Sequence, residues 1–277
     1  MRMKVTVFKF IGLLIFIAGL CLAYGFFVEP RFLKTRHVTV KTQLSAPIKI
    51  GLISDIHIGG FHMPPERVMK IVANVMAQQP DVILLAGDYV NGHDRRADQS
   101  DAFNAQIEKG IGALSGLSAP QGVYAAMGNH DSWYGQSYLS ASLTQAGVRV
   151  LINDAVNIDG LCVVGLADAD TGVEDKAAFN ECEKASKIVA LMHSPDSFQY
   201  LRSDTALAVA GHTHGGQINL PFLGRFVTST RLGKPYAYGL KKWNGIPTYI
   251  SAGLGTSILP ARFRAPPETV IIHLVPQ

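Results

Sequence analysis

The most prominent feature of the hydrophobic pattern lies near the N-terminus, where residues 10–28 carry no charged side chain. As an α-helix this run would be roughly 28 Å long, close to the ~30 Å hydrocarbon core of a bilayer. It ends in GFFVEP, which is a poor signal-peptide cleavage site. We therefore predict a retained transmembrane anchor, preceded by a basic tail of residues 1–9. A buried core helix is the alternative, but the run is apolar on every face.

Positive charges flank this run on both sides in nearly equal number. Arg2, Lys4 and Lys9 precede it, and Arg31, Lys34, Arg36 and Lys41 follow it. Cationic flanks tend to stay on the inner side of a membrane. Because translocating a short tail with several cations is unfavourable, we expect the N-terminus inside and the rest of the chain outside.

After a linker expected at residues 29–46, apolar runs alternate with helical segments through residues 47–277, which we interpret as one domain. Helices are expected at residues 65–78, which begin after a proline, and at 134–146. Strands are expected at residues 48–53, 82–86, 122–127, 148–152, 161–166, 187–192 and 207–210. Five of these strands end at a polar residue, and strand carboxyl ends in layered α/β folds converge on one edge. The pattern therefore predicts an α/β domain with a functional site at that edge.

Composition adds a charge asymmetry to this picture. The net charge is +4, yet residues 205–267 contain no Asp or Glu. The cations of this acid-free stretch are Arg225, Arg231, Lys234, Lys241, Lys242, Arg262 and Arg264. They indicate either a basic surface that only aids solubility or one that meets an anionic ligand or a membrane.

The cysteines indicate neither a disulfide framework nor a metal site. Cys21, Cys162 and Cys182 match no zinc-binding or redox spacing. Cys162 and Cys182 could form a disulfide, but nothing in the pattern requires one, so this question is left open.

Residues that carry chemistry follow the expected strands. Asp55 and His57 are two positions apart, so in an extended backbone they point the same way and can hold one ion. Asp88 follows the apolar run VILLA after one glycine, where a carboxylate is costly unless it is paired or binds metal. With two acceptor oxygens, Asp88 can bridge two cations, which is the role we expect. A helix or turn cap is the alternative.

The later motifs are more specific. In GNHD, Asn129 offers a neutral amide oxygen, and His130 is expected beside the site as a proton donor. His193 follows the strand expected at residues 187–192. His212 and His214 lie in GHTHGGQ, where glycines permit close backbone approach next to two nitrogen ligands. A structural zinc site would explain the histidines but not the carboxylates.

In this order the blocks D-x-H, G-D, G-N-H-D, H and G-H-x-H resemble the calcineurin-like metallophosphoesterase family. GHTHGGQ, MHSPD, the N-terminal anchor and the tail at residues 253–268 look like its YkuE/YaeI-type branch of small bacterial phosphodiesterases. The resemblance implies a two-sheet β-sandwich flanked by helices, preceded here by the anchor. It also implies two divalent metal ions, with Mn, Fe or Zn suiting mixed nitrogen and oxygen ligands. One metal would take Asp55, His57, Asp88 and His214, and the other Asp88, Asn129, His193 and His212.

The activity implied by the resemblance is hydrolysis of a phosphoric ester by a hydroxide that bridges the metals, with Asp88 and His130 as catalytic residues. Protein phosphatases of the family carry an Asp three residues after the bridging Asp, where this chain has Asn91. A neutral amide stabilises a protonated imidazole less than a carboxylate does. We therefore expect a phosphodiester or pyrophosphate substrate. A phosphomonoesterase and a catalytically silent metal-binding scaffold are the alternatives.

The substrate is expected beside the acid-free stretch, with Asn91, Arg225 and Arg262 as contacts. Residues 220–227, LPFLGRFV, form either an apolar loop that meets lipid headgroups or the core of a hairpin. The phosphorylated substrate would be a small molecule or lipid-linked, for example UDP-diacylglucosamine, which related enzymes of the family cleave. That compound is cytoplasmic, whereas the expected topology puts the domain on the periplasmic side of a bacterial inner membrane. No nucleic-acid partner is expected, and the oligomeric state is left open.

Overall fold

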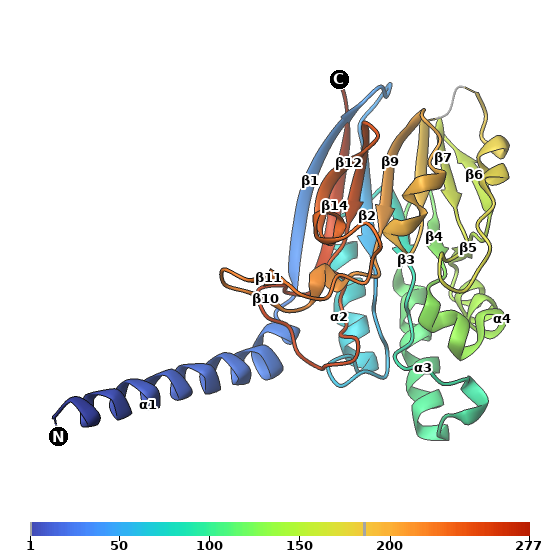
Figure 1. The fold of residues 1–277 in the computed structure, drawn as a ribbon. Coiled ribbons are helices and arrows are strands. Elements are labelled where there is room, and N and C mark those ends of the chain that lie inside the picture. The colour runs from blue at the N-terminus through green and yellow to red at the C-terminus, as the bar shows by residue number, and fades with distance from the viewer. Residues whose placement is uncertain (1, 185–186) are drawn as a thin grey trace.

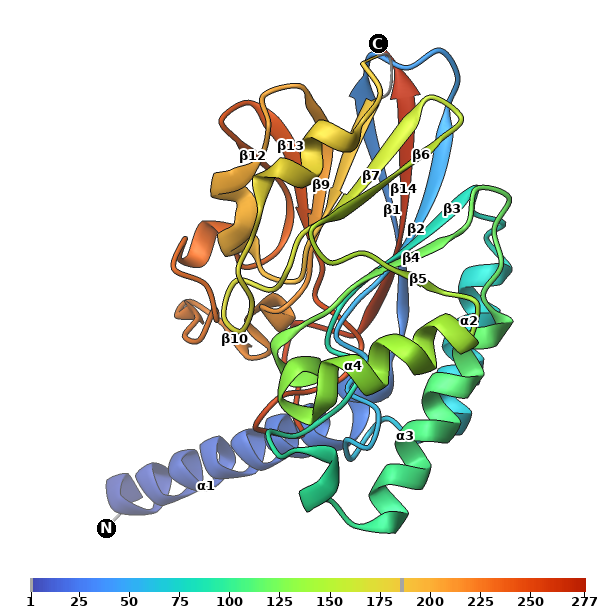
Figure 2. The same ribbon diagram turned by 90° about the vertical axis from the view of Figure 1, so that its right-hand side faces the viewer.

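A computed structural model describes residues 2–184 and 187–277, and two six-stranded sheets packed face to face form its centre (Figures 1 and 2). The first sheet has the order β1-β14-β2-β3-β4-β5 and the second β12-β13-β9-β8-β7-β6. In the first sheet the strands are β1 Lys34–Thr42, β2 Ile48–Ile53, β3 Val82–Ala86, β4 Val123–Ala126, β5 Arg149–Val150 and β14 Glu268–Pro276. In the second they are β6 Asp154–Ile158, β7 Leu161–Gly165, β8 Lys187–Leu191, β9 Thr205–Ala210, β12 Gly239–Trp243 and β13 Ile246–Ile250.

Parallel pairing brings the carboxyl ends of the central strands together. β2, β3 and β4 are parallel neighbours in the first sheet, as are β7, β8 and β9 in the second. Both faces of these strands are covered, which explains why they read as continuous apolar runs rather than alternating ones. Along β3, Val82 and Leu84 pack between the two sheets, while Ile83 and Leu85 face the helices.

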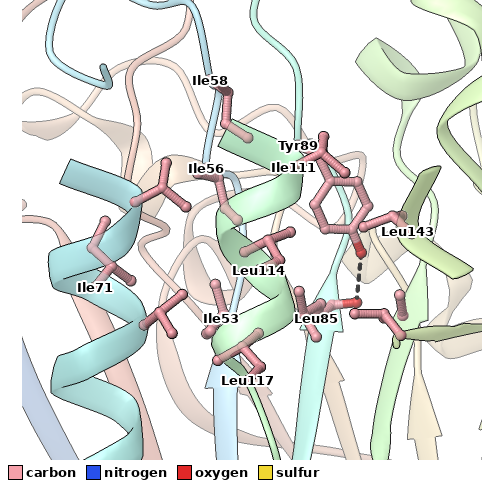
Figure 3. Packing of buried hydrophobic residues seen from close by; sticks show 14 of the residues in the cluster. Ile53, Ile56, Ile58, Ile71, Leu85, Tyr89, Ile111, Leu114, Leu117 and Leu143 are labelled. Carbon is pink, nitrogen blue, oxygen red and sulfur yellow. Dashed lines mark hydrogen bonds between the residues drawn. The ribbon is translucent and has the colours of Figure 1, made fainter. Parts of the chain in front are cut away.

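Three helices cover the outer face of the first sheet (Figure 2). They are α2 (Pro65–Met76), α3 (Asp101–Ala113) and α4 (Asn129–Gln145). A proline begins α2, where its fixed φ suits the first turn, and the Ser100 hydroxyl caps α3 by accepting from the Phe103 N–H. Ile71 of α2 and Ile111 of α3 pack with Ile53 and Leu85 in the cluster of Figure 3.

The outer face of the second sheet packs against some of the short 3-10 helices, through Phe179 of η5 (Lys176–Glu181), Phe198 of η6 (Pro195–Tyr200) and Tyr236 of η8 (Lys234–Tyr236). A disulfide joins Cys162 on β7 to Cys182, which follows η5. The sequence had left open whether these two cysteines are bonded. The 3-10 helices are η2 Glu29–Arg31, η3 Arg96–Asp98, η4 Leu114–Gly116, η5 Lys176–Glu181, η6 Pro195–Tyr200, η7 His214–Gly216 and η8 Lys234–Tyr236. A separate two-stranded hairpin consists of β10 (Asn219–Leu220) and β11 (Gly224–Arg225).

Before the domain, α1 (Arg2–Ala23) continues into a π-helix, η1 (Tyr24–Val28), and projects away from the sandwich (Figure 1). Within Phe8–Arg31 a stretch of 18 residues has a mean hydropathy of 2.5, and the helix is long and apolar enough to cross a membrane. The prediction that residues 29–46 form a linker is wrong. Glu29 and Pro30 are buried, and residues 34–42 form β1, which pairs along its whole length with β14.

The predicted two-sheet sandwich flanked by helices is confirmed, and the predicted strands 48–53 and 82–86 coincide with β2 and β3. The helix expected at residues 134–146 begins earlier, at Asn129, and is kinked at Gly135. The elements that the apolar pattern did not predict are α3, β1, β6, β10, β11, β12, β13 and β14.

Candidate metal centre

The expected ligands come together at the carboxyl ends of the central strands. Each follows shortly after a strand: Asp55 and His57 after β2, Asp88 after β3, Asn129 after β4 as the first residue of α4, His193 after β8, and His212 and His214 after β9. All are buried except His212, which is partly exposed. Two sheets thus contribute side chains to one buried cluster.

One group of four ligand atoms belongs to Asp55, His57, Asp88 and His214, and all lie within 4.8 Å of one another. His57 Nε2 is 3.1 Å from His214 Nε2 and 3.5 Å from Asp88 Oδ2. His214 Nε2 is 3.6 Å from Asp55 Oδ1. Four donors that face one point in this way could hold a metal ion.

A second group shares Asp88 with the first. Asp88, His193 and His212 also offer ligand atoms within 4.8 Å of one another. His193 Nε2 lies 3.3 Å from Asp88 Oδ2, 3.1 Å from Asn129 Oδ1 and 3.0 Å from His212 Nδ1. The arrangement could therefore hold two ions with Asp88 between them.

Burial shifts the pKa values of His57 and Asp55 in opposite directions. Burial lowers the pKa of His57 to about 3, although Asp88 opposes the shift, so the ring is neutral and can donate a lone pair. Burial raises the pKa of Asp55 to about 7, and the charge of Asp88 adds to this shift. Asp55 Oδ2 is also buried without a hydrogen-bond partner among the described residues. A cation beside Asp55 would compensate that unpaired oxygen.

Five of the expected ligands have a left-handed backbone. Their φ angles are 49° at Asp55, 51° at His57, 58° at Asp88, 68° at His212 and 51° at His214. This region is uncommon for residues with a side chain, and it persists only where the surroundings enforce it. Strain concentrated at the side chains that converge is typical of a functional site.

Glycines make the close approach of these loops possible. A Cβ on Gly128 would collide with the Asp88 carboxylate, and one on Gly253, whose φ is +66°, would lie 2.5 Å from Asp55 Cβ. The Gly253 loop also donates to the first ligand loop, since the N–H of Gly255 bonds to the Asp55 carbonyl at 2.7 Å. The tail after β13 thus supports the ligands from outside.

Neighbouring groups orient the imidazole rings and the Asp88 loop. His193 Nδ1 lies 2.8 Å from the Ala86 carbonyl, which leaves Nε2 for a metal. His212 Nε2 lies 3.5 Å from Asp170, which leaves Nδ1 facing the cluster. Asp131 accepts from the N–H groups of Gly128 and Asp88, each at 2.8 Å. Asp131 thereby joins two ligand loops.

His130 stands beside the cluster rather than within it. Its Nδ1 lies 2.6 Å from the Gly92 carbonyl, and its Nε2 lies 4.0 Å from Asp88 Oδ2. The ring packs against those of His57, His93 and Trp133, with centroids 4.7, 4.8 and 4.9 Å away. Nε2 is therefore the nitrogen that can exchange a proton with a group bound at the cluster.

The three residues expected to contact substrate are placed differently from one another. Arg262 is wholly buried and donates to the carbonyls of Gly255, Ala265 and Ala252, so a substrate contact there is wrong. Arg225 Nε donates to the Gly215 carbonyl at 2.6 Å, behind the loop of His212 and His214. Asn91 is half-buried, and its N–H bonds to Ile58.

Two residues near His212 were not singled out from the sequence. Asp170 lies between His212 and Arg231, whose Nη2 is 3.6 Å from Asp170 Oδ1. The Arg231 side chain is 76% exposed, and its Nε also lies 3.8 Å from Asp196 Oδ2. Arg231 lies in the acid-free stretch, but spacing alone did not distinguish it from the other cations there.

Comparison with known proteins agrees with this geometry. The profile of the family described as calcineurin-like phosphoesterase matches residues 48–216, more than half of the chain. The uncharacterized metallophosphoesterase YkuE of Bacillus subtilis (strain 168) is 29% identical over 269 residues, 93% of this chain and 91% of YkuE. Phosphodiesterase YaeI of Escherichia coli (strain K12) is 31% identical over 239 residues, 83% of either protein. The solved 5'-nucleotidase precursor of Thermus thermophilus aligns at a TM-score of 0.48 and 15% identity, over 83% of this chain and 54% of that one.

The family match spans all five motif blocks, and their side chains meet in one cluster suited to divalent metals. The matches to YkuE and YaeI cover 91% and 83% of the length of those proteins. The chain therefore belongs to the calcineurin-like phosphoesterase family and is a metal-dependent phosphoric ester hydrolase.

Proposed function

We propose that the protein hydrolyses a phosphodiester or pyrophosphate bond with two divalent metal ions, Mn, Fe or Zn. One ion would be held by Asp55, His57, Asp88 and His214, and the other by Asp88, Asn129, His193 and His212. The single observation that carries this proposal is that Asp88 belongs to both groups of converging ligand atoms. A carboxylate shared in this way is typical of two-metal hydrolases.

When bound, the metals would supply a water-derived nucleophile and neutralise charge on the phosphoryl oxygens. The overall reaction adds one water, breaks one phosphorus–oxygen bond and leaves a proton on the departing oxygen. His130 is placed to deliver that proton from Nε2, because its Nδ1 is engaged by Gly92. Arg231, open to solvent beyond Asp170, would bind a non-bridging phosphate oxygen.

The hydrogen-bond partner of His130 favours a substrate with a good leaving group. The Gly92 carbonyl is a neutral acceptor, so it supports a protonated ring less than a carboxylate would. Asn91, which precedes Gly92 in the chain, is also uncharged and so does not stabilise a protonated ring as a carboxylate would. A phosphodiester or pyrophosphate suits a weaker acid better than an alkyl monoester does, and the relative YaeI carries the name phosphodiesterase.

We also propose that α1 anchors the chain in a membrane with the domain on the periplasmic side. Only 6% of the apolar stretch is buried in the described structure, so its side chains have no core there to pack into. The Cys162–Cys182 disulfide favours an oxidising compartment. This placement argues against UDP-diacylglucosamine, which is cytoplasmic, and in favour of a lipid-linked phosphate on the outer side.

The function is tested with bis(p-nitrophenyl) phosphate and p-nitrophenyl phosphate, each with added Mn²⁺. We expect hydrolysis of the diester in preference to the monoester, and a loss of at least about 100-fold in Asp88→Ala and His130→Ala. His37→Ala, on the exposed edge strand β1, is the control and should retain wild-type activity. Preference for the monoester would indicate a phosphomonoesterase, and no metal-dependent hydrolysis of either compound would indicate a silent scaffold.

A further inference from the structure

An apolar hollow of about 170 Å³ has His214 among the residues that line it. Its walls include Phe226, Val227, Ile258 and Leu259. For comparison, an engineered apolar cavity of about 150 Å³ holds a benzene molecule. The hollow is therefore large enough for part of a hydrocarbon chain.

The walls of the hollow are apolar and open to solvent. Phe226 is 60% exposed and Ile258 is 89% exposed. At the tip of the neighbouring hairpin, Phe222 and Leu223 are 108% and 62% exposed, so the alternative that these residues form a hairpin core is wrong. Contiguous exposed apolar side chains next to a reactive site mark a binding surface for an apolar group.

Hydrogen bonds fix one wall to the loop that carries His212 and His214. Gln217, directly after this loop, donates from Nε2 to the carbonyls of Ser257 and Leu259 at 3.1 and 2.9 Å. The Ser257 N–H donates back to Gln217 Oε1 at 2.9 Å. A group in the hollow would therefore have a fixed position relative to the metal ligands.

The same region is fixed to the end of the anchor. The Phe263 N–H donates to the Gln217 carbonyl at 2.9 Å, and the Arg262 N–H donates to the Gly25 carbonyl at 2.9 Å. The ring of Tyr24 packs edge-on against Phe263, 6.2 Å between centroids. In both views the β10–β11 hairpin lies at the end of the domain from which α1 leaves (Figures 1 and 2). The wall of the hollow is thus connected, through Gln217 and residues 262–263, to the end of the apolar helix.

We infer that this hollow holds the hydrocarbon chain of a membrane lipid whose phosphodiester or pyrophosphate lies at the metal ligands. The inference rests on the proposed function and names its substrate class. The chain would enter from the bilayer around α1, and the phosphate would lie next to His214, which borders both the hollow and the ligand cluster. Nearby cations agree with an anionic headgroup, since Lys234 Nζ lies 6.0 Å from the centre of the Phe226 ring.

The test is a series of alkyl p-nitrophenyl phosphates, from methyl to long chain, hydrolysed by the full chain in lipid nanodiscs. We expect kcat/KM to rise with chain length, by up to about fourfold for each methylene that enters the hollow. The variant Phe226→Ser/Ile258→Ser should flatten this dependence. The matched control is Phe222→Ser/Leu223→Ser at the hairpin tip, which does not line the hollow and should keep the dependence. Because partition into the bilayer is the same for every variant, differences between them report on the hollow.

The outcomes separate the inference from the function beneath it. Hydrolysis of the methyl ester without any gain from longer chains overturns the inference and leaves the proposed function standing. A gain that survives in Phe226→Ser/Ile258→Ser, or that is lost only in Phe222→Ser/Leu223→Ser, overturns it as well, because the chain then lies elsewhere. No hydrolysis of any diester overturns the proposed function and the inference with it.

Discussion

The residues that converge on the candidate metals occupy backbone conformations that their side chains disfavour. Asp55, His57, Asp88, His212 and His214 all have positive φ, a conformation in which a Cβ crowds the following carbonyl. Such strain costs of order 1–3 kcal/mol per residue and is maintained by the surrounding contacts. The strain turns several ligand atoms toward the same points, which extended or helical backbone at these positions would not do.

Relief of this strain is measurable at His212, the partly exposed ligand. His212→Gly and His212→Ala remove the same ligand, but only glycine adopts the φ of 68° without cost. We expect the glycine variant to be more stable than the alanine variant by about 1 kcal/mol of unfolding free energy in the presence of a chelator. Chemical denaturation of the two variants gives this difference. Equal stability, or a more stable alanine variant, would show that the backbone is not strained there.

His62 gives a pH dependence that does not involve a ligand. Its Nε2 lies 2.9 Å from the Pro260 carbonyl, and burial together with the charges of Arg31 and Arg67 lowers its pKa below the ordinary value. The unfolded chain therefore takes up the proton first, so stability falls as the pH drops below about 6.5 toward the folded-state pKa. We expect the wild type to lose more unfolding free energy than His62→Gln between about pH 8 and about pH 5. An equal or smaller loss in the wild type would contradict this sign.

At the scale of elements, the residues that follow α1 are part of the domain rather than a linker. The buried carboxylate of Glu29 accepts from the N–H groups of Arg264 and Ala265 at 2.9 and 2.6 Å. Arg67 of α2 donates to the Pro30 carbonyl at 2.6 Å. These contacts fix the exit of α1 beside the loop of Arg262, whose guanidinium lies 3.5 Å from His214 Nδ1. The direction of α1 and the position of a candidate ligand loop are thereby linked.

These contacts predict that Glu29 contributes to the free energy of unfolding. Glu29→Ala leaves the buried N–H of Ala265 and the partly buried N–H of Arg264 without their acceptor, and a buried group costs about 1–3 kcal/mol. We expect a loss of about 1–3 kcal/mol in unfolding free energy, measured by denaturant titration of the full chain in detergent. Glu183→Ala, at an exposed position, is the control and should change stability little. A Glu29→Ala variant as stable as this control would mean that the residues after α1 are not built into the domain.

Elements were predictable from the sequence where burial on both faces leaves a continuous apolar run, as in β2 and β3. β1, KTRHVTVKT, is an edge strand with several cations, and it resembles a linker until β14 pairs with it. The ligand set follows from motif order, because each motif comes directly after a strand. Arg262 was not predictable, because its burial depends on backbone carbonyls that only the folded tail brings around it.

At the scale of the whole molecule, the apolar helix, the hairpin and the candidate metal ligands lie at one end of the sandwich (Figure 1). The disulfide adds information about the compartment. If the domain lies on the periplasmic side, Cys162 and Cys182 should be oxidised in cells while Cys21 is a free thiol. Maleimide labelling of denatured protein, with and without prior reduction, should show two additional labelled thiols after reduction. Full labelling without a reductant would place the domain in a reducing compartment.

The central claim is that hydrolysis depends on two metal ions that share Asp88, and a metal titration of the stripped protein tests it most directly. Chelator-treated full-length protein is titrated with Mn²⁺ while bound metal and bis(p-nitrophenyl) phosphate hydrolysis are followed together. We predict that activity is absent without metal and reaches its maximum at two bound ions per chain, and that Asp88→Ala holds fewer ions and stays inactive. Full activity in the metal-free protein, or a fully loaded protein that hydrolyses no phosphoric ester, would contradict the account.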